Sequence, residues 1–306
     1  MRPNTFTFFT CILAFVIIGA AYGKNAAAVS YPPAHVQYIT NGSLRIAYED
    51  YGTNIRGSIL FIHGLDDSRT IWRPIADAFS NRYRVVMYDL KGHGNSSDGN
   101  GDYSYPALVK ELRTVTVKLG LTNAAVVGHS LGAAIITHYL RAYSNDFSRI
   151  VFLDPAVKII PAELYYIAGI ISFQTARFSS AKRDDYLGLP KYKKWDRYSI
   201  ENFDACYTFR DNAFYPRVSD PTLEKILATI ASCDYKTNYA HVNRDIHAVI
   251  FRIGVVYDRA LIQDFLKQFN DANISYFPFV HNPLLFEYTA LTEDVRRYLE
   301  KDNSKK

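Results

Sequence analysis

Short apolar runs alternate with amphipathic segments between residues 35 and 155, and this alternation restricts the possible folds more than any other feature. Four of the runs are rich in β-branched or aliphatic residues: Ser58–Ile62, Arg84–Tyr88, Ala124–Val127 and Arg149–Leu153. Runs of this kind are typical of strands that helices cover on both faces. Strands that alternate with helices predict a mostly parallel sheet, because a parallel connection needs a crossover of helix length.

The sheet is predicted to start with an antiparallel hairpin. The segments His35–Thr40 and Ser43–Tyr51 are separated by Asn41-Gly42, a dipeptide that favours tight hairpin turns. A helix is expected between two of the buried strands, and it should end at Gly120. Its apolar positions recur at three- and four-residue intervals: Leu108, Leu112, Val115 and Leu119.

The alternation stops between Pro155 and about Asp245, where aromatic residues and lysines crowd together. It resumes with the strands His247–Ile253 and Asn273–Phe277 and a last helix around Leu291–Leu299. The middle stretch is therefore predicted to be an insertion that lies over the C-terminal ends of the strands, where open α/β sheets bind ligands. The predicted parts are a core in two pieces and the insertion: residues 24–154, 246–306 and 155–245.

The first 23 residues have the pattern of a secretory signal. Arg2 precedes an apolar stretch from Cys11 to Ala21, and Ala21 and Gly23 are small residues suited to cleavage. The apolar stretch is shorter than the roughly 18 to 20 residues that span a bilayer. We therefore expect a secreted or periplasmic protein with a cleaved signal peptide, and anchoring by an uncleaved N-terminal segment is the alternative.

Composition argues against several classes of partner. The net charge of +5 is spread along the chain, without a basic helix, zinc-finger spacing or RNA-binding signature, so nucleic acid is not an expected partner. The sequence lacks H-E-x-x-H and paired Cys-His spacing, so no metal and no cofactor is implied. Signal removal would leave Cys206 and Cys233, and their spacing does not decide whether they form a disulfide.

The segment Gly128-His129-Ser130-Leu131-Gly132 has the form G-x-S-x-G. The run Ala124–Val127 leads into it and Leu131–Leu140 is expected to leave it as a helix, so the strand, sharp turn and helix that this motif needs are all present. Glycines flank the serine because the turn crowds the backbone. The serine hydroxyl then stands at a helix N-terminus, where the helix dipole favours developing negative charge. Ser130 is therefore the predicted nucleophile.

A serine hydroxyl needs a base to take its proton, and in this arrangement the chain order is serine, acid, histidine. His281 follows the strand Asn273–Phe277 and precedes the last helix, so it is the predicted base. The acid must end another strand so that its carboxylate can orient the imidazole. Asp258, after the strand that ends at Ile253, is favoured, and Asp154, which ends the strand Arg149–Leu153, is the alternative.

A tetrahedral intermediate also needs donors for its oxyanion, and backbone N–H groups supply them without rearrangement. The first predicted donor is the amide of Leu131, directly after the serine. The second is the amide of Leu65 in His63-Gly64-Leu65, which follows the strand ending at Ile62. His63 itself is predicted to be structural and to shape this turn through a side-chain hydrogen bond.

These motifs together resemble the α/β-hydrolase superfamily, in its branch of serine esterases and lipases with a helical cap. The resemblance covers most of residues 35–302. It is carried by His63-Gly64, Asp89–Ser96, Gly128–Gly132, Val151–Pro155, and His281 with Pro283 and Glu287. It implies a mostly parallel central sheet with helices on both faces and a helical cap insertion, and a structural role for the Asp89–Ser96 turn. Relatives usually place glycine three residues before the acid, whereas Gly254 lies four before Asp258, so Asp154 stays open.

The expected activity is hydrolysis of a moderately apolar carboxylic ester through an acyl-enzyme, with a small-molecule substrate or a lipid at a membrane surface. Aromatic residues of the insertion are expected to line an apolar pocket or to form the core of the insertion: Tyr165, Tyr166, Phe173, Phe178, Tyr186, Trp195, Tyr198, Phe203, Tyr207, Phe209 and Phe214. C–C bond hydrolases, peptidases and acyltransferases share the triad and stay open, as does a catalytically silent ligand-binding protein. The sequence does not indicate the oligomeric state.

Overall fold

The computed structural model describes residues 36–156, 196–211, 213–233, 245–253, 259–269, 272–280, 284 and 287–301. Within these residues an eight-stranded sheet has the order β1-β2-β4-β3-β5-β6-β9-β10. The strands are β1 Gln37–Asn41, β2 Leu44–Gly52, β3 Ser58–Ile62, β4 Arg84–Tyr88, β5 Ala124–His129, β6 Phe147–Leu153, β9 Asp245–Ile253 and β10 Ala272–Val280. Only the pairs that involve β2 are antiparallel, so the predicted mostly parallel sheet and its opening hairpin are confirmed.

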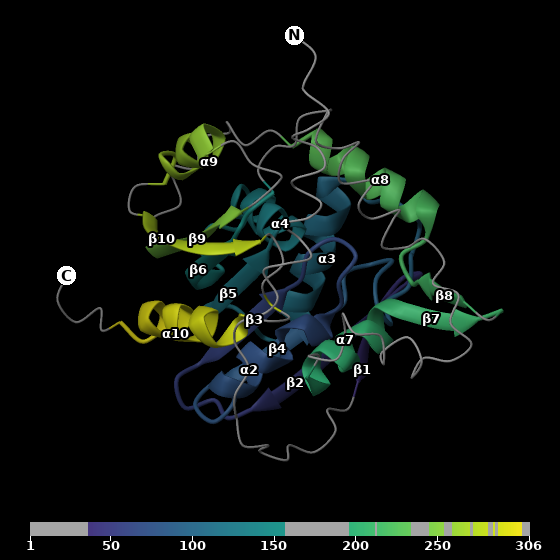
Figure 1. The fold of residues 1–306 in the computed structure, drawn as a ribbon, viewed down its shortest axis with the longest axis horizontal. Coiled ribbons are helices and arrows are strands. Elements are labelled where there is room, and N and C mark those ends of the chain that lie inside the picture. Colours follow the sequence, from purple (N-terminus) through teal and green to yellow (C-terminus); the bar gives the residue numbers. More distant parts are fainter. Residues whose placement is uncertain are drawn as a thin grey trace, which may run out of the picture.

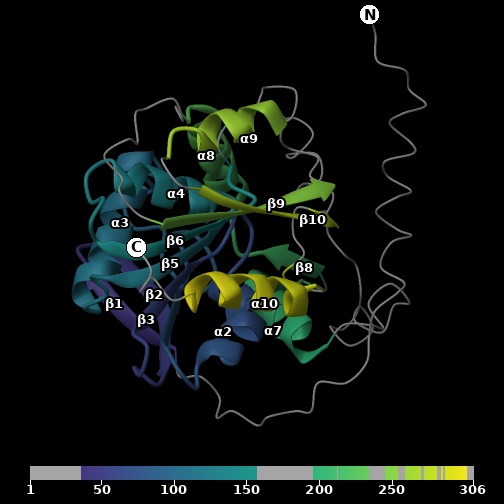
Figure 2. The ribbon, with the colours of Figure 1, turned by 90° about the vertical axis from the view of Figure 1, so that its left-hand side faces the viewer.

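Helices cover both faces of this sheet, as predicted. The helices of the described residues are the 3₁₀ turn η2 Arg69–Trp72 and the α-helices α2 Arg73–Phe79, α3 Tyr105–Lys118, α4 Leu131–Leu140, α7 Arg197–Cys206, α8 Asp220–Ala231, α9 Arg259–Leu266 and α10 Tyr288–Leu299. Figure 1 shows how they surround the strands, and in Figure 2 α4 and α9 lie on one side of the sheet while α2 and α10 lie on the other. Within the described residues, no helix is both long and apolar enough to cross a bilayer.

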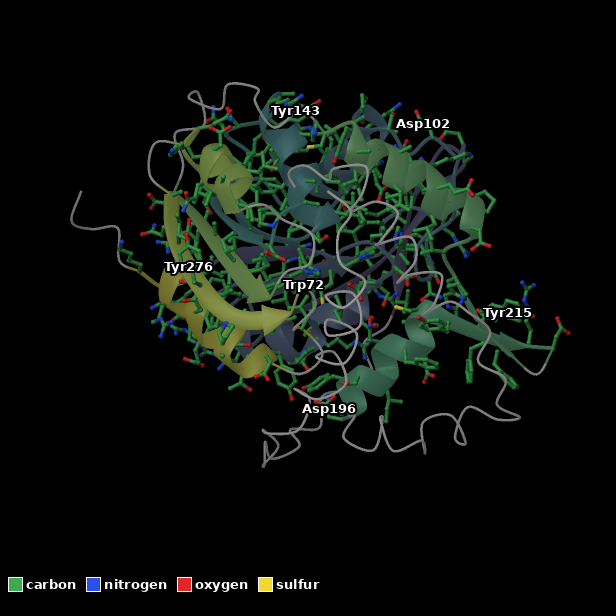
Figure 3. The ribbon with its side chains drawn as sticks, turned by 45° about the horizontal axis from the view of Figure 1, so that its top comes forward. Trp72, Asp102, Tyr143, Asp196, Tyr215 and Tyr276 are labelled. Carbon is green, nitrogen blue, oxygen red and sulfur yellow. The ribbon has the colours of Figure 1, made fainter. Side chains whose placement is uncertain are left out.

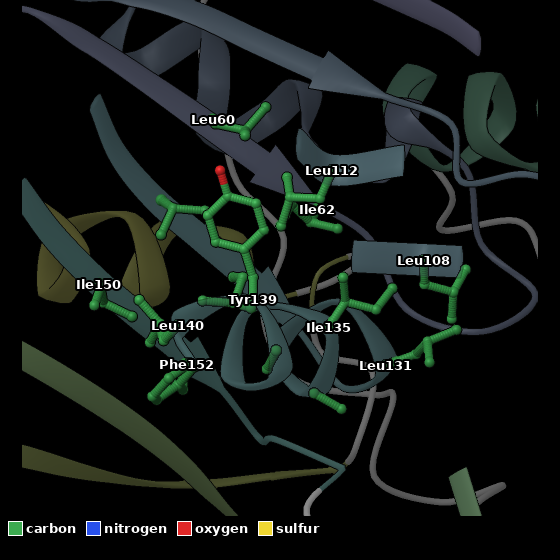
Figure 4. Packing of buried hydrophobic residues seen from close by; sticks show 14 of the residues in the cluster. Leu60, Ile62, Leu108, Leu112, Leu131, Ile135, Tyr139, Leu140, Ile150 and Phe152 are labelled. Atoms are coloured by element: carbon green, nitrogen blue, oxygen red, sulfur yellow. The ribbon is translucent and has the colours of Figure 1, made fainter. Parts of the chain in front are cut away.

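The core consists of two apolar layers that the sheet separates. Alternate residues of one strand enter different layers: Leu60 of β3 packs in the cluster with α3 and α4, and Phe61 packs in the cluster with α2 and α10. Figure 4 shows the first layer, where Tyr139 and Ile135 of α4 lie among strand residues. Since both faces are buried, these strands have the continuous apolar sequences from which they were predicted.

Side chains on the outermost strand of the sheet are more exposed than those of the core. Trp72 is fully buried, whereas Tyr276 on the outer strand β10 is 43% exposed, and Figure 3 shows both. Cys206 and Cys233 are both buried and form no disulfide, so the pairing that the sequence left open is not formed in the structure. His247 lies in the core, where its Nε2 pairs with Asp294 at 2.7 Å and ties β9 to α10.

The described part of the chain between β6 and β9 lies against the C-terminal ends of the strands. It contains α7, α8 and a separate two-stranded sheet formed by β7 Tyr207–Arg210 and β8 Ala213–Pro216, which the sequence did not predict. On α7, Asn202 Oδ1 accepts hydrogen bonds from Ser68 Oγ and Thr70 Oγ1 at 3.1 and 3.0 Å, in the loop after β3. On α8, Thr229 Oγ1 donates to the carbonyl of Tyr103 at 3.0 Å, in the connection after β4. The exact bounds of the core and the insertion stay a prediction, and the predicted signal segment lies outside the described residues.

Glu111 of α3 supports the turn that follows β4 from inside the core. The backbone N–H of Lys91 donates to Glu111 Oε1 at 3.0 Å. The other carboxyl oxygen is buried and has no hydrogen-bond partner among the described residues. Burial raises the pKa of Glu111 to about 8, so the carboxyl is protonated in the folded chain at neutral pH.

We expect Glu111→Gln to remove a pH dependence of stability. The folded-state pKa lies above that of the unfolded chain, so the contribution of Glu111 is fully present below about pH 4.5 and declines by roughly 1.4 kcal/mol per pH unit until about pH 8. Glutamine keeps the acceptor for Lys91 and cannot ionise. The free energy of unfolding, measured by chemical denaturation from pH 5 to 8, should therefore fall less steeply in the variant. Asp264→Asn on the exposed face of α9 is the control and should follow the wild type; equal slopes for wild type and Glu111→Gln would contradict the assignment.

Candidate active site

Ser130 occupies the sharp turn between β5 and α4. Its backbone has φ of 49° and ψ of −112°, a conformation that non-glycine residues adopt at a cost and that is typical of functional turns. The Ser130 N–H donates to the carbonyl of Leu153 at 3.0 Å, and the N–H of Ala134 donates to the carbonyl of Ser130 at 3.1 Å. The structure therefore has the strand, sharp turn and helix around Ser130 that the sequence predicted.

The glycines that flank Ser130 are required by close backbone approach. A Cβ atom on Gly132 would lie 2.7 Å from the carbonyl oxygen of His63, and one on Gly128 would lie 2.8 Å from the amide nitrogen of Ala133. Real Cβ atoms do not approach so closely, so neither position accepts a side chain without a backbone shift. The start of α4 is thereby held against the end of β3.

The loop after β3 runs beside the nucleophile. The two strands β3 and β5 are parallel neighbours, and a Cβ atom on Gly64 would lie 3.3 Å from the Cβ of Ser130. Leu65 follows Gly64, and Leu131 is the first residue of α4, where N–H groups have no partner within the helix. The structure thus brings together the segments that hold Ser130, Leu65 and Leu131.

Of the two candidate acids, Asp154 lies within the described residues. It follows β6, is fully buried, and has a positive φ of 42°. Its N–H donates to the carbonyl of Val249 at 2.8 Å, and its Oδ1 accepts from the N–H of Phe251 at 3.3 Å, so its carboxyl faces β9.

Asp258 and His281 lie outside the described residues, but the strands that lead to them are described. β9 ends at Ile253, five residues before Asp258, and β10 ends at Val280, directly before His281. The neighbouring order β5-β6-β9-β10 places the ends of the strands that precede Ser130 and all three candidate partners along one edge of the sheet.

Two buried histidines near the turn are structural. The Nε2 of His63 accepts from the N–H of Leu90 at 3.0 Å, so its Nδ1 carries the proton and donates to the carbonyl of Gly64 at 2.7 Å. Burial holds the pKa of His63 well below its usual range, and burial also lowers the pKa of His93 to about 4. Both imidazoles are neutral at neutral pH, and His63 fixes the turn as the sequence predicted.

A buried ion network fixes the loops next to this turn, and sequence reasoning missed it. Arg69 donates from Nε to Glu49 at 2.9 Å and from its terminal nitrogen to Asp89 at 2.5 Å. The same terminal nitrogen donates to Asn95 Oδ1 at 3.1 Å, and the N–H of Asn95 donates to Asp89 at 2.8 Å. Arg73 continues the network, because it pairs with Glu49. The structural role that the resemblance implied for the turn from Asp89 is therefore supported by its contacts.

We expect Arg69→Met to lower the free energy of unfolding by roughly 3–5 kcal/mol, because it leaves the carboxylates of Glu49 and Asp89 buried with fewer counter-charges. Urea denaturation at pH 7 measures the change. Arg197→Met is the matched control, since Arg197 is exposed and its closest contact with Asp77 is 3.7 Å; it should cost less than about 1 kcal/mol. An equally small cost for Arg69→Met would show that the network does not stabilise the fold.

The loop beside the nucleophile also carries two adjacent carboxyl groups, Asp66 and Asp67, which the sequence analysis did not single out. Asp66 is partly exposed and has a positive φ of 62°, whereas Asp67 is 6% exposed. Burial, followed by the neighbouring charge of Asp67, raises the pKa of Asp66 to about 7. A group with a shifted pKa, two residues after the glycine that lies against Ser130, is a candidate for a functional role.

Comparisons with known proteins agree with this geometry. The family described as "alpha/beta hydrolase fold" matches residues 57–214, which is more than half of the chain. A Mycobacterium tuberculosis protein described as uncharacterized is 29% identical over 122 residues, which cover 40% of this chain and 35% of that protein. The match therefore spans about a third of that curated relative.

Solved structures match over a larger share of the chain. The structure of E-2-(acetamidomethylene)succinate hydrolase has a TM-score of 0.75 at 17% identity, and the match covers 88% of this chain and 100% of that one. The enol-lactonase from Burkholderia xenovorans LB400 has a TM-score of 0.67 at 14% identity, with 87% and 100% covered. At these identities the likeness shows a shared fold.

Proposed function

The chain belongs to the α/β-hydrolase fold family, and on this basis we propose that it is a serine hydrolase with Ser130 as nucleophile and His281 as general base. The observation that carries the proposal is the conformation of Ser130. A serine with φ of 49° between a buried strand and a helix, flanked by glycines that admit no side chain, is costly for the fold. In this fold family that turn presents a nucleophile.

The proposed reaction is acyl transfer in two steps. Ser130 Oγ attacks the acyl carbon while His281 takes the hydroxyl proton, and the amides of Leu65 and Leu131 hold the oxyanion. His281 then protonates the leaving alcohol, which departs and leaves the acyl-enzyme. Water attacks the acyl-enzyme with His281 again as base, and the carboxylic acid and free Ser130 are released. Asp258 orients the imidazole in this scheme.

The favoured substrate is a small, moderately apolar carboxylic ester. Leu65, beside Ser130, packs against the apolar cluster of Val218 and Leu223, so the described side of the site next to α8 is apolar. Relatives with the same fold include an enol-lactonase and a marine esterase, according to their structures. If the protein is exported, a lipid ester at a membrane surface is a related candidate substrate.

The described aromatic residues between β6 and β9 mostly pack on one another. Phe203 stacks with Tyr207 at 4.7 Å and meets Phe214 at 5.1 Å, and Phe209 meets Phe214 at 4.8 Å between ring centroids. Phe203 and Phe214 are buried in this cluster and Phe209 is 41% exposed, so these rings pack mainly on one another. The expected aromatic residues from Tyr165 to Trp195 lie outside the described residues.

A fluorophosphonate probe tests the nucleophile, because it phosphonylates only a serine activated by a base. We expect one probe adduct per chain, located on Ser130 by peptide mass spectrometry and absent in Ser130→Ala. Ser232→Ala, at an exposed serine, is the control and should label like the wild type. A well-folded wild type that does not react with the probe would instead favour a silent ligand-binding protein.

The identity of the acid is tested by two amide substitutions. We expect Asp258→Asn to lower kcat/KM for a p-nitrophenyl ester by about ten-thousandfold, because the imidazole loses its orientation. Asp154→Asn should have a much smaller effect, since asparagine can still accept the N–H of Phe251 and keep β6 joined to β9. Loss of turnover in Asp154→Asn alone would move the acid to Asp154, which the sequence kept as the alternative.

A further inference from the structure

Asp66 is an unpaired carboxyl group in the loop that passes the nucleophile. Among the described residues it has neither a hydrogen-bond donor nor a cation as partner, and the one charged neighbour that affects its pKa is the acidic Asp67. The nearby guanidinium groups are committed elsewhere: Arg69 to Glu49 and Asp89, and Arg73 to Glu49 and Glu201. The described surroundings of Asp66 therefore contain more negative than positive charge.

The helix that faces this loop does not supply a counter-charge. Cys206 of α7 is buried, and the pKa of its thiol is raised well above the usual value by burial and then by Asp67 and Asp66. The thiol is therefore uncharged at neutral pH. Asn202 of α7 also faces this loop, and its amide oxygen accepts hydrogen bonds from Ser68 and Thr70. The cations on this side, Arg73 and Arg197, pair with Glu201 and Asp77, and among the described residues neither affects the pKa of Asp66.

The local backbone does not require a charged residue at position 66. A φ of 62° favours glycine, asparagine or aspartate, and asparagine or glycine would satisfy it without ionisation. A partly buried carboxylate without a partner lowers stability, because water no longer solvates it fully. A positively charged ligand group placed beside it would remove this cost.

Asp66 lies two residues after the part of the loop that contacts Ser130. Gly64 lies against Ser130, Leu65 packs against the apolar residues Val218 and Leu223, and Asp66 comes next. Consecutive residues of one loop therefore provide an apolar contact towards α8 and a carboxyl group whose charge reaches Cys206 on α7.

We propose that Asp66 is a specificity-determining residue, which favours substrates with a cationic ammonium group near the scissile carbonyl and disfavours substrates with a carboxylate there. This inference rests on the proposed function, because it describes which acyl groups the Ser130 site accepts. It distinguishes this chain from the structurally similar enzyme named for a succinate substrate, whose substrate is an anion.

Three p-nitrophenyl esters of similar size test the inference: 4-(trimethylammonio)butanoate, its uncharged isostere 5,5-dimethylhexanoate, and the monoester of adipate. Their charges are positive, neutral and negative, and the quaternary ammonium does not titrate. We expect the wild type to prefer the cationic over the neutral ester by about tenfold in kcat/KM at pH 8, and to disfavour the anionic ester. In Asp66→Asn these ratios should approach one, since asparagine keeps the backbone conformation.

Glu224→Gln is the control for a change of net charge alone. Glu224 is an exposed residue of α8, so this variant should keep the wild-type ratios. The cationic-to-neutral ratio of the wild type should also rise between pH 6 and 8, as Asp66 loses its proton at a pKa of about 7, and it should stay flat in Asp66→Asn. Titration of the catalytic histidine changes the turnover of both esters equally and therefore cancels in the ratio. The titratable groups whose charges interact with Asp66 are Asp67 and Cys206.

The experiment distinguishes failure of the role proposed for Asp66 from failure of the proposed serine hydrolase activity. Turnover of all three esters without a charge preference, or a preference that survives in Asp66→Asn, would overturn the role of Asp66 and leave the serine hydrolase intact. No turnover of any ester together with no fluorophosphonate adduct on Ser130 would overturn both. Thermal unfolding of each variant confirms that the ratios are measured on folded protein.

Discussion

The close approach of α4 to the end of β3 is the constraint on which the site depends. Gly132 lies so near the carbonyl of His63 that no side chain fits between them, and the helix N-terminus is therefore held beside the loop of Leu65. Ser130, directly before this helix, has a positive φ, and the hydrogen bond from its N–H to Leu153 anchors the strained residue to β6. The sheet therefore bears the cost of the strained backbone conformation at Ser130, which lies between the N-terminus of α4 and the loop of Leu65.

Buried charges hold the surrounding loops in place around that turn. Arg69 connects β2, through Glu49, to the turn that begins at Asp89. Arg73 extends the connection from Glu49 to Glu201 on α7, so one network joins the sheet to the chain between β6 and β9. Each charge alone would be costly in the core, and mutual pairing offsets that cost only in one geometry. The network therefore favours a single arrangement of loops above the strand ends.

Local patterns predicted the parts of this structure that local sequence determines. The runs Ser58–Ile62 and Arg84–Tyr88 coincide with β3 and β4, because a short apolar run buried on both faces has clear limits. The motif at Ser130 is contiguous and was found for the same reason. The partners of Arg69 were missed, since they lie about 20 residues away on both sides and only the folded sheet brings them together. The identity of the triad acid stayed undecided between Asp258 and Asp154. Neighbouring parallel strands end at the same edge of the sheet, so the residue after either strand could orient the histidine.

In the loop after β3, each of four consecutive residues has a different contact or property next to the proposed site. His63 ties the loop to Leu90 through a neutral imidazole, and Gly64 allows contact with Ser130. Leu65 meets apolar residues of the chain between β6 and β9, and Asp66 carries charge that its backbone conformation does not need. The nucleophile belongs to a different element, so substitutions at positions 65 and 66 can alter the fit and the charge of the acyl group while the turn at Ser130 stays unchanged. In the proposed scheme this loop supplies one oxyanion amide and selects the substrate, and the nucleophile lies on the neighbouring strand-to-helix turn.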